Sequence, residues 1–157
     1  MAVNFQPSQY HSLTPNLVCK NANAAIEFYK KVLGATVLAN MPGPNNTVMH
    51  AELKIGDSIF FVADSMNPAG AATAAAGQSL PCYVHVYIPD VDAAVKTATE
   101  LGATVDMPVQ DMFWGDRYGK ISDPFGQQWG VATHKEDVSE DEMNRRMSAM
   151  MQKSAQG

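Results

Sequence analysis

The chain has 157 residues, of which 46% are hydrophobic and 17% charged, a composition that fits one globular domain with a sizeable core. The net charge is −5 at pH 7, and lysines and arginines form no cluster longer than a pair, which argues against nucleic acid and anionic membranes as partners. No apolar run approaches the roughly 20 residues of a membrane-spanning helix, and residues 1–11 lack a signal-peptide pattern, so we expect a cytoplasmic protein.

The first half of the chain predicts one strand, one helix and three further strands. Ile26, Tyr29 and Leu33 recur at helical spacing, and a glycine follows as the expected stop of a helix over residues 22–33. Strand patterns lie at residues 13–20, 36–41, 47–55 and 58–64, with turn residues between the last three. Residues 67–79 are rich in alanine and glycine. A short helix is one interpretation of them, but Pro68 and Gly70 favour a mobile linker.

The second half predicts the same order of elements. Its strand patterns lie at residues 82–88, 104–109, near 119–122 and at 127–133, with a helix over residues 91–101. The pentapeptide Leu33-Gly34-Ala35-Thr36-Val37 recurs as Leu101-Gly102-Ala103-Thr104-Val105, and Val62-Ala63 matches Val131-Ala132. Internal similarity fixes architecture, so the sequence predicts an α+β protein made of two βαβββ modules that superpose.

A helical tail and two cysteines complete the pattern. Ser139 and Glu142 form a capping box, and the helix that follows carries a stripe of methionines, which we expect to pack on the body or on a second subunit: Met143, Met147, Met150 and Met151. Cys19 and Cys82 lie in apolar strand patterns, and we interpret both as buried free thiols.

An ordered set of motifs resembles the vicinal-oxygen-chelate superfamily, which contains glyoxalase I, bleomycin-resistance proteins and extradiol dioxygenases, and is most similar to its PhnB-like branch. The motifs are Ala25-Ile26-Glu27-Phe28-Tyr29 through Leu33-Gly34-Ala35, Met49-His50-Ala51-Glu52-Leu53 before Gly56-Asp57, Trp114-Gly115-Asp116-Arg117, Asp123-Pro124-Phe125-Gly126 and Ala132-Thr133-His134. The resemblance implies paired modules curled into an open, cupped mixed β-barrel with helices outside, and a homodimer. The whole chain, 1–157, would form one such domain, with module one at about 11–66, a linker at 67–80, module two at about 81–134 and a tail at 135–157.

The resemblance also implies where a metal would be held. Enzymes of this superfamily bind one divalent ion through four side chains of the first and last strands of each module. The corresponding positions here are Thr14, Phe61, Tyr83 and Gly130. Phenylalanine and glycine side chains offer no ligand atom, and threonine and tyrosine are poor ligands. We therefore expect no metal and no cofactor, and a similarity to the metal-free binders of the superfamily.

Strand alternation predicts which side chains line a pocket. Residues 49, 51, 53 and 55 are apolar and are expected to face the helix, which turns His50 and Glu52 to the concave side. The same alternation places five further residues in the concavity: Thr14, Asn16, Tyr83, His85 and Tyr87. Phe61 joins this set through the register that the resemblance implies. Polar groups within apolar walls are typical of a small-molecule site. Trp114 is expected to close over the ligand and Arg117 to grip an anionic group at the pocket mouth.

Plainer interpretations of these residues stay open. His50 and Glu52 can pair with each other or face solvent, and His85 can be a satisfied core histidine. A structural Asp116–Arg117 pair can pin its loop, and His11 and His134 are expected to have no role because they lie near element ends.

Three hypotheses for function follow. The first is a metal-free binder of a small molecule, such as a drug-sequestering protein. The second is a lyase, isomerase or dioxygenase that uses a nonstandard metal or acid–base site built from His50, Glu52 and His85. The third is a dimeric interaction module without a ligand, whose methionine stripe binds a partner. The first is favoured because the cup is polar whereas the usual metal positions lack ligands.

Overall fold

The computed structural model describes residues 4–66 and 80–154. The first module consists of β1 (Asn16–Cys19), α1 (Ala22–Leu33), β2 (Thr36–Pro42), a short 3-10 turn η1 (Pro44–Asn46), β3 (Val48–Ile55) and β4 (Ser58–Asp64). Its four strands form a sheet in the order β1-β4-β3-β2, in which β1 runs parallel to β4 and the other neighbours are antiparallel.

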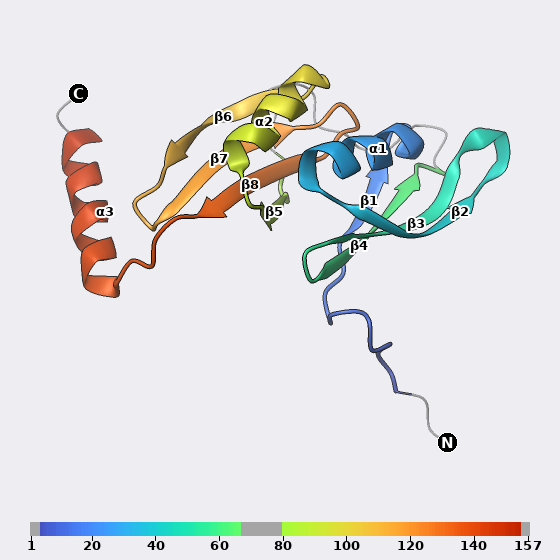
Figure 1. Cartoon of the computed structure of the whole chain (residues 1–157), viewed down its shortest axis with the longest axis horizontal. Helices are drawn as coiled ribbons and strands as arrows, with labels where there is room; N and C mark the ends of the chain where they lie inside the picture. Colours follow the sequence, from blue (N-terminus) through green and yellow to red (C-terminus); the bar gives the residue numbers. More distant parts are fainter. Residues whose placement is uncertain (1–3, 67–79, 155–157) are drawn as a thin grey trace.

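The second module repeats this topology. It consists of β5 (Val84–Tyr87), α2 (Val91–Glu100), β6 (Thr104–Asp111), β7 (Asp116–Ser122) and β8 (Gln128–His134), with the sheet order β5-β8-β7-β6 and β5 parallel to β8. The two mixed sheets confirm the predicted α+β architecture of paired βαβββ units and do not close into a barrel (Figure 1).

Local signals explain the helix boundaries. The Asn21 side chain accepts a 3.2 Å hydrogen bond from the backbone N–H of Ala24 and caps α1, which ends at Gly34 in a left-handed conformation (φ 67°). Asp90 caps α2 in the same way, through the N–H of Ala93. Because these signals are local, the predicted bounds of α1 and the start of α2 agree with the structure.

The two modules share one core. The helices α1 and α2 pack against each other, and buried residues of both modules form a single apolar cluster (Figure 1). Aromatic rings join the halves, because Tyr29 of α1 lies 5.1 Å from Trp129 of β8 and Phe28 lies 5.8 Å from Phe125. Packing of the helix-covered faces therefore fixes how the modules sit together.

Some strand predictions need correction. The first strand begins at Asn16 rather than at residue 13, and Leu13 is 89% exposed, because Pro15 has no N–H to donate to a ladder. Met49 does not face the helix: it is 49% exposed and Val48 is buried, since the pairing of β2 with β3 shifts register at this point. Cys82 precedes β5 and is exposed, whereas Cys19 is buried as expected.

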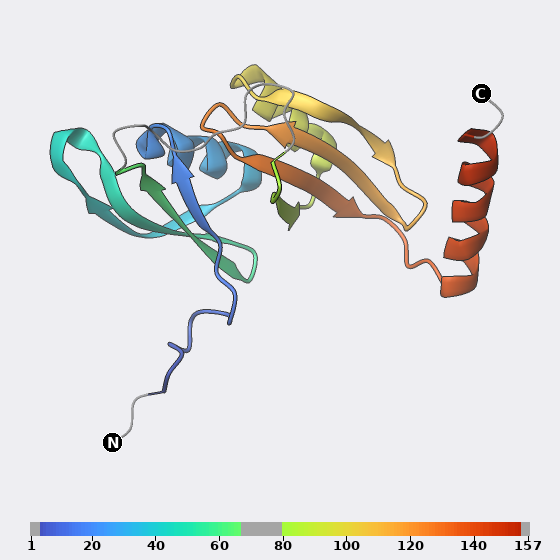
Figure 2. The ribbon, with the colours of Figure 1, turned by 180° about the vertical axis from the view of Figure 1, so that it is seen from behind.

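Both ends of the described chain extend from the body. The segment before β1 leads away from the first sheet, and α3 (Glu140–Ser154) stands at the far end of the second module (Figures 1 and 2). The predicted cap of α3 is present, because the backbone N–H of Glu142 donates to Ser139 Oγ. No helix in the described ranges is long and apolar enough to cross a membrane. The linker predicted over residues 67–80 lies outside the described residues except for Leu80.

Candidate functional site

The open face of the second sheet carries a group of aromatic side chains. By alternation, Ile121, Trp129 and Val131 face α2 and the core, where each is at most 1% exposed. The opposite face presents the side chains of β5, β7 and β8, together with Tyr83 and Trp114 beside the strands. We call five of these residues the aromatic wall: Tyr83, His85, Tyr87, Trp114 and Tyr118.

Ring contacts order the aromatic wall. The His85 ring lies parallel to that of Tyr118, with centroids 5.5 Å apart and an interplanar angle of 6°. Tyr87 lies 5.0 Å from His85 on β5, and Trp114 lies 6.1 Å from Tyr118. Burial raises the pKa of Tyr118 to about 12, with its hydrogen bond to Tyr83 as a further cause, so the Tyr118 hydroxyl stays protonated at neutral pH.

A missing side chain makes room for these rings. Gly130 lies on β8 directly opposite His85. A Cβ atom at this position would lie 2.8 Å from the Tyr118 hydroxyl oxygen and 3.0 Å from Cε2 of Tyr83. The glycine therefore lets two tyrosine rings lie across the strand.

A buried carboxylate supports one end of the wall. Asp116 is 4% exposed and accepts hydrogen bonds from the Tyr87 hydroxyl (2.8 Å) and Trp114 Nε1 (3.0 Å), both at Oδ2. Its Oδ1 lies 2.7 Å from Nδ1 of His134. Burial acts to raise the pKa of Asp116, but the hydrogen bonds from His134, Tyr87 and Trp114 outweigh burial and lower it. Trp114 is thus held in the wall and does not form a free lid.

His134 has a structural role that the sequence interpretation missed. Its ring bridges Asp116 and Asp137, with Nε2 3.1 Å from Oδ1 of Asp137. The hydrogen bond to Asp116 is the largest cause of a raised His134 pKa, and the bond to Asp137 is the next. Register could have revealed the first contact, because Asp116 and His134 are cross-strand partners at the ends of β7 and β8.

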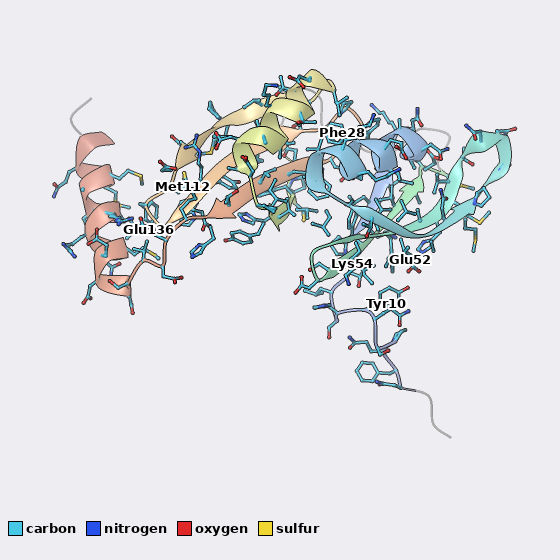
Figure 3. The ribbon with its side chains drawn as sticks, in the orientation of Figure 1. Tyr10, Phe28, Glu52, Lys54, Met112 and Glu136 are labelled. Carbon is cyan, nitrogen blue, oxygen red and sulfur yellow. The ribbon has the colours of Figure 1, made fainter. Side chains whose placement is uncertain are left out.

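A smaller polar group lies on the first sheet. The Tyr10 hydroxyl donates a 2.6 Å hydrogen bond to Oε1 of Glu52, and both residues are labelled in Figure 3. Nε2 of His50 lies 3.6 Å from the same oxygen. The Phe61 ring contacts both Tyr10 and His50, with centroids 5.5 and 4.8 Å away. This group shows the predicted pairing of His50 with Glu52, and Tyr10 is a member that the sequence analysis missed.

The structure thus brings the predicted site residues together as two groups. Thr14, Asn16, His50, Glu52 and Phe61 belong to the first module and the aromatic wall belongs to the second. Across the described residues, the two groups share no hydrogen bond, ion pair or ring contact. Because the modules of one chain pack through their helices, convergence of both groups on one cavity stays a prediction.

The residues present do not fit the metal that the superfamily implies. The register sets Asn16 opposite Phe61 and His85 opposite Gly130, two residues beyond the Thr14 and Tyr83 expected from sequence. Phe61 and Gly130 have no donor atom, and tyrosine rings fill the space beside the glycine. No three His, Cys, Asp or Glu side chains gather as ligands anywhere in ranges 4–66 and 80–154. The set of His50, Glu52 and His85 is accordingly not a ligand cluster within one chain.

Arg117 lies elsewhere than at a pocket mouth. Its guanidinium donates through Nε and Nη2 to both carboxylate oxygens of Asp92 on α2, and through Nη1 to Asp111 at 3.1 Å. Arg117 is the second residue of β7, so strand alternation turns it to the helix side, away from Asp116 and Tyr118. Both sequence interpretations of Arg117, as a ligand for an anionic group and as a partner of Asp116, are therefore wrong. The guanidinium group is already bonded to Asp92 and Asp111.

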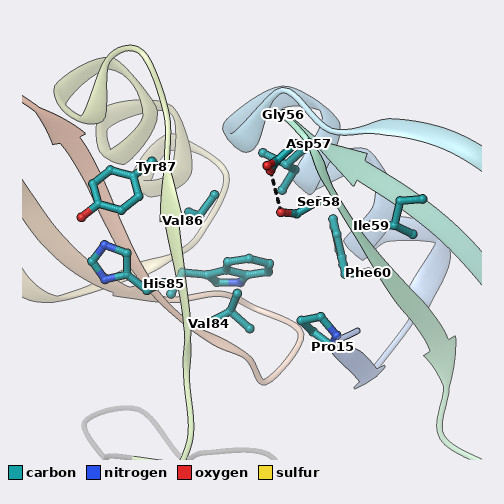
Figure 4. A pocket seen from close by; sticks show the side chains of 12 residues that line it. Pro15, Gly56, Asp57, Ser58, Ile59, Phe60, Val84, His85, Val86 and Tyr87 are labelled. Atoms are coloured by element: carbon teal, nitrogen blue, oxygen red, sulfur yellow. Dashed lines mark hydrogen bonds between the residues drawn. The ribbon is translucent and has the colours of Figure 1, made fainter. Parts of the chain in front are cut away.

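A cavity of about 240 Å³ lies between the modules, where the β3–β4 hairpin meets β5. Val84, Val86 and Phe60 point into it (Figure 4), and Trp129 also lines it. Figure 4 shows the rings of His85 and Tyr87 on the other side of β5, so these two residues line the cavity through their backbone. The sequence did not predict this cavity, because no local pattern reports where the two modules meet.

Comparisons with known proteins agree with this architecture. The family model described as the Glyoxalase/Bleomycin resistance protein/Dioxygenase superfamily matches residues 10–131. The uncharacterized protein Mb0911c of Mycobacterium bovis is 36% identical over 152 residues, which cover 95% of this chain and 97% of that protein.

Solved structures show the same fold. The crystal structure of TioX from Micromonospora sp. ML1 is similar with a TM-score of 0.60 and 25% identity, covering 82% of this chain and all of that one. A PhnB protein from Bacillus cereus shares the fold at 18% identity with a TM-score of 0.59, over 78% of this chain and 99% of the other. The repeated βαβββ topology and the family match together show that the chain belongs to the glyoxalase/bleomycin resistance protein/dioxygenase superfamily.

Proposed function

We propose that this protein binds a small organic molecule on the aromatic wall without the help of a metal ion. The observation that carries the proposal is the arrangement around Gly130, where a missing side chain lets tyrosine rings occupy the place of a potential metal ligand. Exposed apolar rings with a few fixed polar groups are the usual composition of a ligand site. Tyr83 and Tyr87 are 44% and 58% exposed, so their ring surfaces are accessible to a ligand.

The Asp116 network supports binding rather than catalysis. Three donors hold its carboxylate, and that carboxylate in turn fixes the orientation of Tyr87 and Trp114. A site that is rigid before the ligand arrives loses less side-chain freedom on binding. The network therefore supports a preorganised surface.

We also propose that the working unit is a homodimer in the cytoplasm. The segment before β1 and helix α3 extend from the body, and Met150 and Met151 are 47% and 59% exposed on that helix. A second copy would cover this apolar surface. In such a dimer, the Tyr10, His50 and Glu52 group of one copy could lie beside the aromatic wall of the other copy. Within the described residues of one chain, this group does not contact the wall. The free thiols of Cys19 and Cys82 support a reducing compartment.

A ligand screen tests the proposed binding. Compounds that raise the melting temperature of the purified protein are titrated by calorimetry against the wild type and His85→Ala. We expect the variant to lose at least tenfold in affinity, because His85 occupies the centre of the wall. Glu100→Ala, at the exposed end of α2, is the control and keeps wild-type affinity. A hit that His85→Ala binds as tightly as the wild type contradicts the site, and a screen without hits favours a module that has no ligand.

Light scattering tests the dimer. The double variant Met150→Glu/Met151→Glu is expected to shift the mass toward the monomer at micromolar concentration, because it places two charges on the proposed contact. Gln152→Glu adds a charge on the opposite side of α3 and serves as the matched control. A wild-type mass of one chain would contradict the proposal.

A further inference from the structure

We infer that the ligand of the aromatic wall is a planar aromatic acid, a flat ring system that carries a carboxylate. This inference rests on the proposed function and deepens it. It joins two observations about the same face, namely the exposed rings and a cation that lies among them.

The cation is Lys120. It lies on β7 opposite Gly130, and its Nζ atom stands 4.4 Å from the centroid of the Tyr83 ring. The side chain is partly buried, yet among the described residues it forms no ion pair. A partly desolvated ammonium group that contacts a ring and forms no ion pair interacts favourably with an added carboxylate.

The acidic residues of this face are already occupied. Asp106 accepts hydrogen bonds from Ser122 Oγ (2.7 Å) and from the side chain of Gln128 (3.3 Å). Asp116 is buried and receives three donors. The oxygens of both carboxylates are thus engaged by groups of this chain, whereas the Lys120 ammonium has no carboxylate partner among the described residues and can pair with a ligand anion.

The rings define the shape of the ligand. Tyr83 and Tyr87 are exposed, and the ring of His85 lies between Tyr87 and the buried Tyr118. A flat ligand can stack on several of these rings at once, whereas a puckered saturated ring touches them at fewer atoms. Because the Lys120 ammonium lies over the Tyr83 ring, a ligand ring that packs beside it on the wall can bring a carboxylate to this ammonium.

Three probes separate the two parts of the inference. They are 2-naphthoate, its neutral amide 2-naphthamide and the saturated acid decahydronaphthalene-2-carboxylate, each titrated by calorimetry. We expect the wild type to bind 2-naphthoate at least tenfold more tightly than either relative. Lys120→Met should lower the affinity for 2-naphthoate about tenfold, or about 1.4 kcal/mol, and abolish the preference over the amide. Lys120→Arg should retain the preference for the acid over the amide. Lys96→Met, on the outer face of α2, is the control because it removes the same positive charge away from the wall.

Several results would overturn the inference. They are equal affinity for the acid and the amide, equal affinity for the flat and the saturated acid, or a preference that survives in Lys120→Met. The proposed function fails separately. If compounds of another class bind and lose affinity in His85→Ala, the site stands and only the ligand class is wrong, whereas the absence of any binding at the wall removes both.

Discussion

The hydroxyl of Tyr29 on α1 donates a 2.8 Å hydrogen bond to Oδ2 of Asp123, in the turn between β7 and β8, and so joins the two modules inside the core. Nε1 of Trp129 donates to the same oxygen at 3.0 Å, and the other carboxylate oxygen accepts the backbone N–H groups of Phe125 and Gln127. Tyr29 is fully buried, and this burial raises its pKa well above the ordinary value. The Asp123 carboxylate thus fixes the turn between β7 and β8 and links it to α1 of the first module.

Tyr29→Phe tests this connection. The phenylalanine ring keeps the packing against Trp129 and Phe60 but removes one donor to a buried carboxylate, so we expect the free energy of unfolding to fall by about 1–3 kcal/mol. Urea denaturation measures the change. The unfolding should remain a single transition, because the modules share one core. An unchanged midpoint, or two separate transitions in the wild type, would contradict this account.

The parts of the fold that the sequence predicted are those with local signals. The bounds of α1 and β4 agree with the structure, because Asn21 and Gly34 mark the helix ends and Gly56-Asp57 marks the turn before β4. The matching topology of the two sheets follows from the repeated pentapeptide. Alternation predicted that His85 and Tyr87 lie on the side of β5 opposite to Val84 and Val86, and the structure shows this arrangement. That His85 and Tyr87 line a ligand pocket stays a prediction.

The remaining parts depend on contacts between distant residues. The position of Arg117 was missed because Trp114-Gly115 suggested that Arg117 lies in a loop. In the structure β7 already starts at Asp116, so strand alternation fixes the side of the sheet on which Arg117 lies. The Tyr29–Asp123 bond and the separation of the two polar groups depend on how the modules pack. No periodicity within either module reports that packing.

Stability should depend on pH through His134. The folded-state pKa of His134 lies above its unfolded value of about 6.5, so its protonated form stabilises the fold below that pH. This contribution is lost as the pH rises through the folded-state pKa. We expect the melting temperature of the wild type to exceed that of His134→Gln at about pH 5.5, with a difference that shrinks by about pH 8.5. A difference that grows with pH would contradict the assigned contacts with Asp116 and Asp137.

Gly130→Ala should disturb the aromatic wall. The new Cβ atom would lie 2.8 Å from the Tyr118 hydroxyl oxygen, so the ring must shift, and we expect a loss of about 1–3 kcal/mol of stability. Ligand affinity should fall with it. Adding Tyr118→Phe removes the closest atom and should restore part of both losses, as measured by thermal melting and calorimetry. Wild-type affinity in Gly130→Ala would show that the wall is not the binding surface.

Arg117→Ala should leave ligand affinity unchanged. The guanidinium pairs with Asp92 and Asp111 on the helix side of β7, and all three side chains are partly exposed, so we expect only a small fall in melting temperature. Calorimetry with the best ligand of the screen checks the first expectation. A loss of affinity for anionic ligands in this variant would place Arg117 at the site after all.

The most direct test of the central claim maps the bound ligand after metal ions have been removed. The protein is dialysed against a chelator, and the amide spectrum is recorded by NMR while the strongest ligand of the screen is added. We expect unchanged affinity, with the largest shifts in β5, β7 and β8 around His85, Tyr118 and Gly130. Binding that disappears with the metal and returns when a divalent ion is restored, or shifts confined to other elements, would contradict a metal-free site on the aromatic wall.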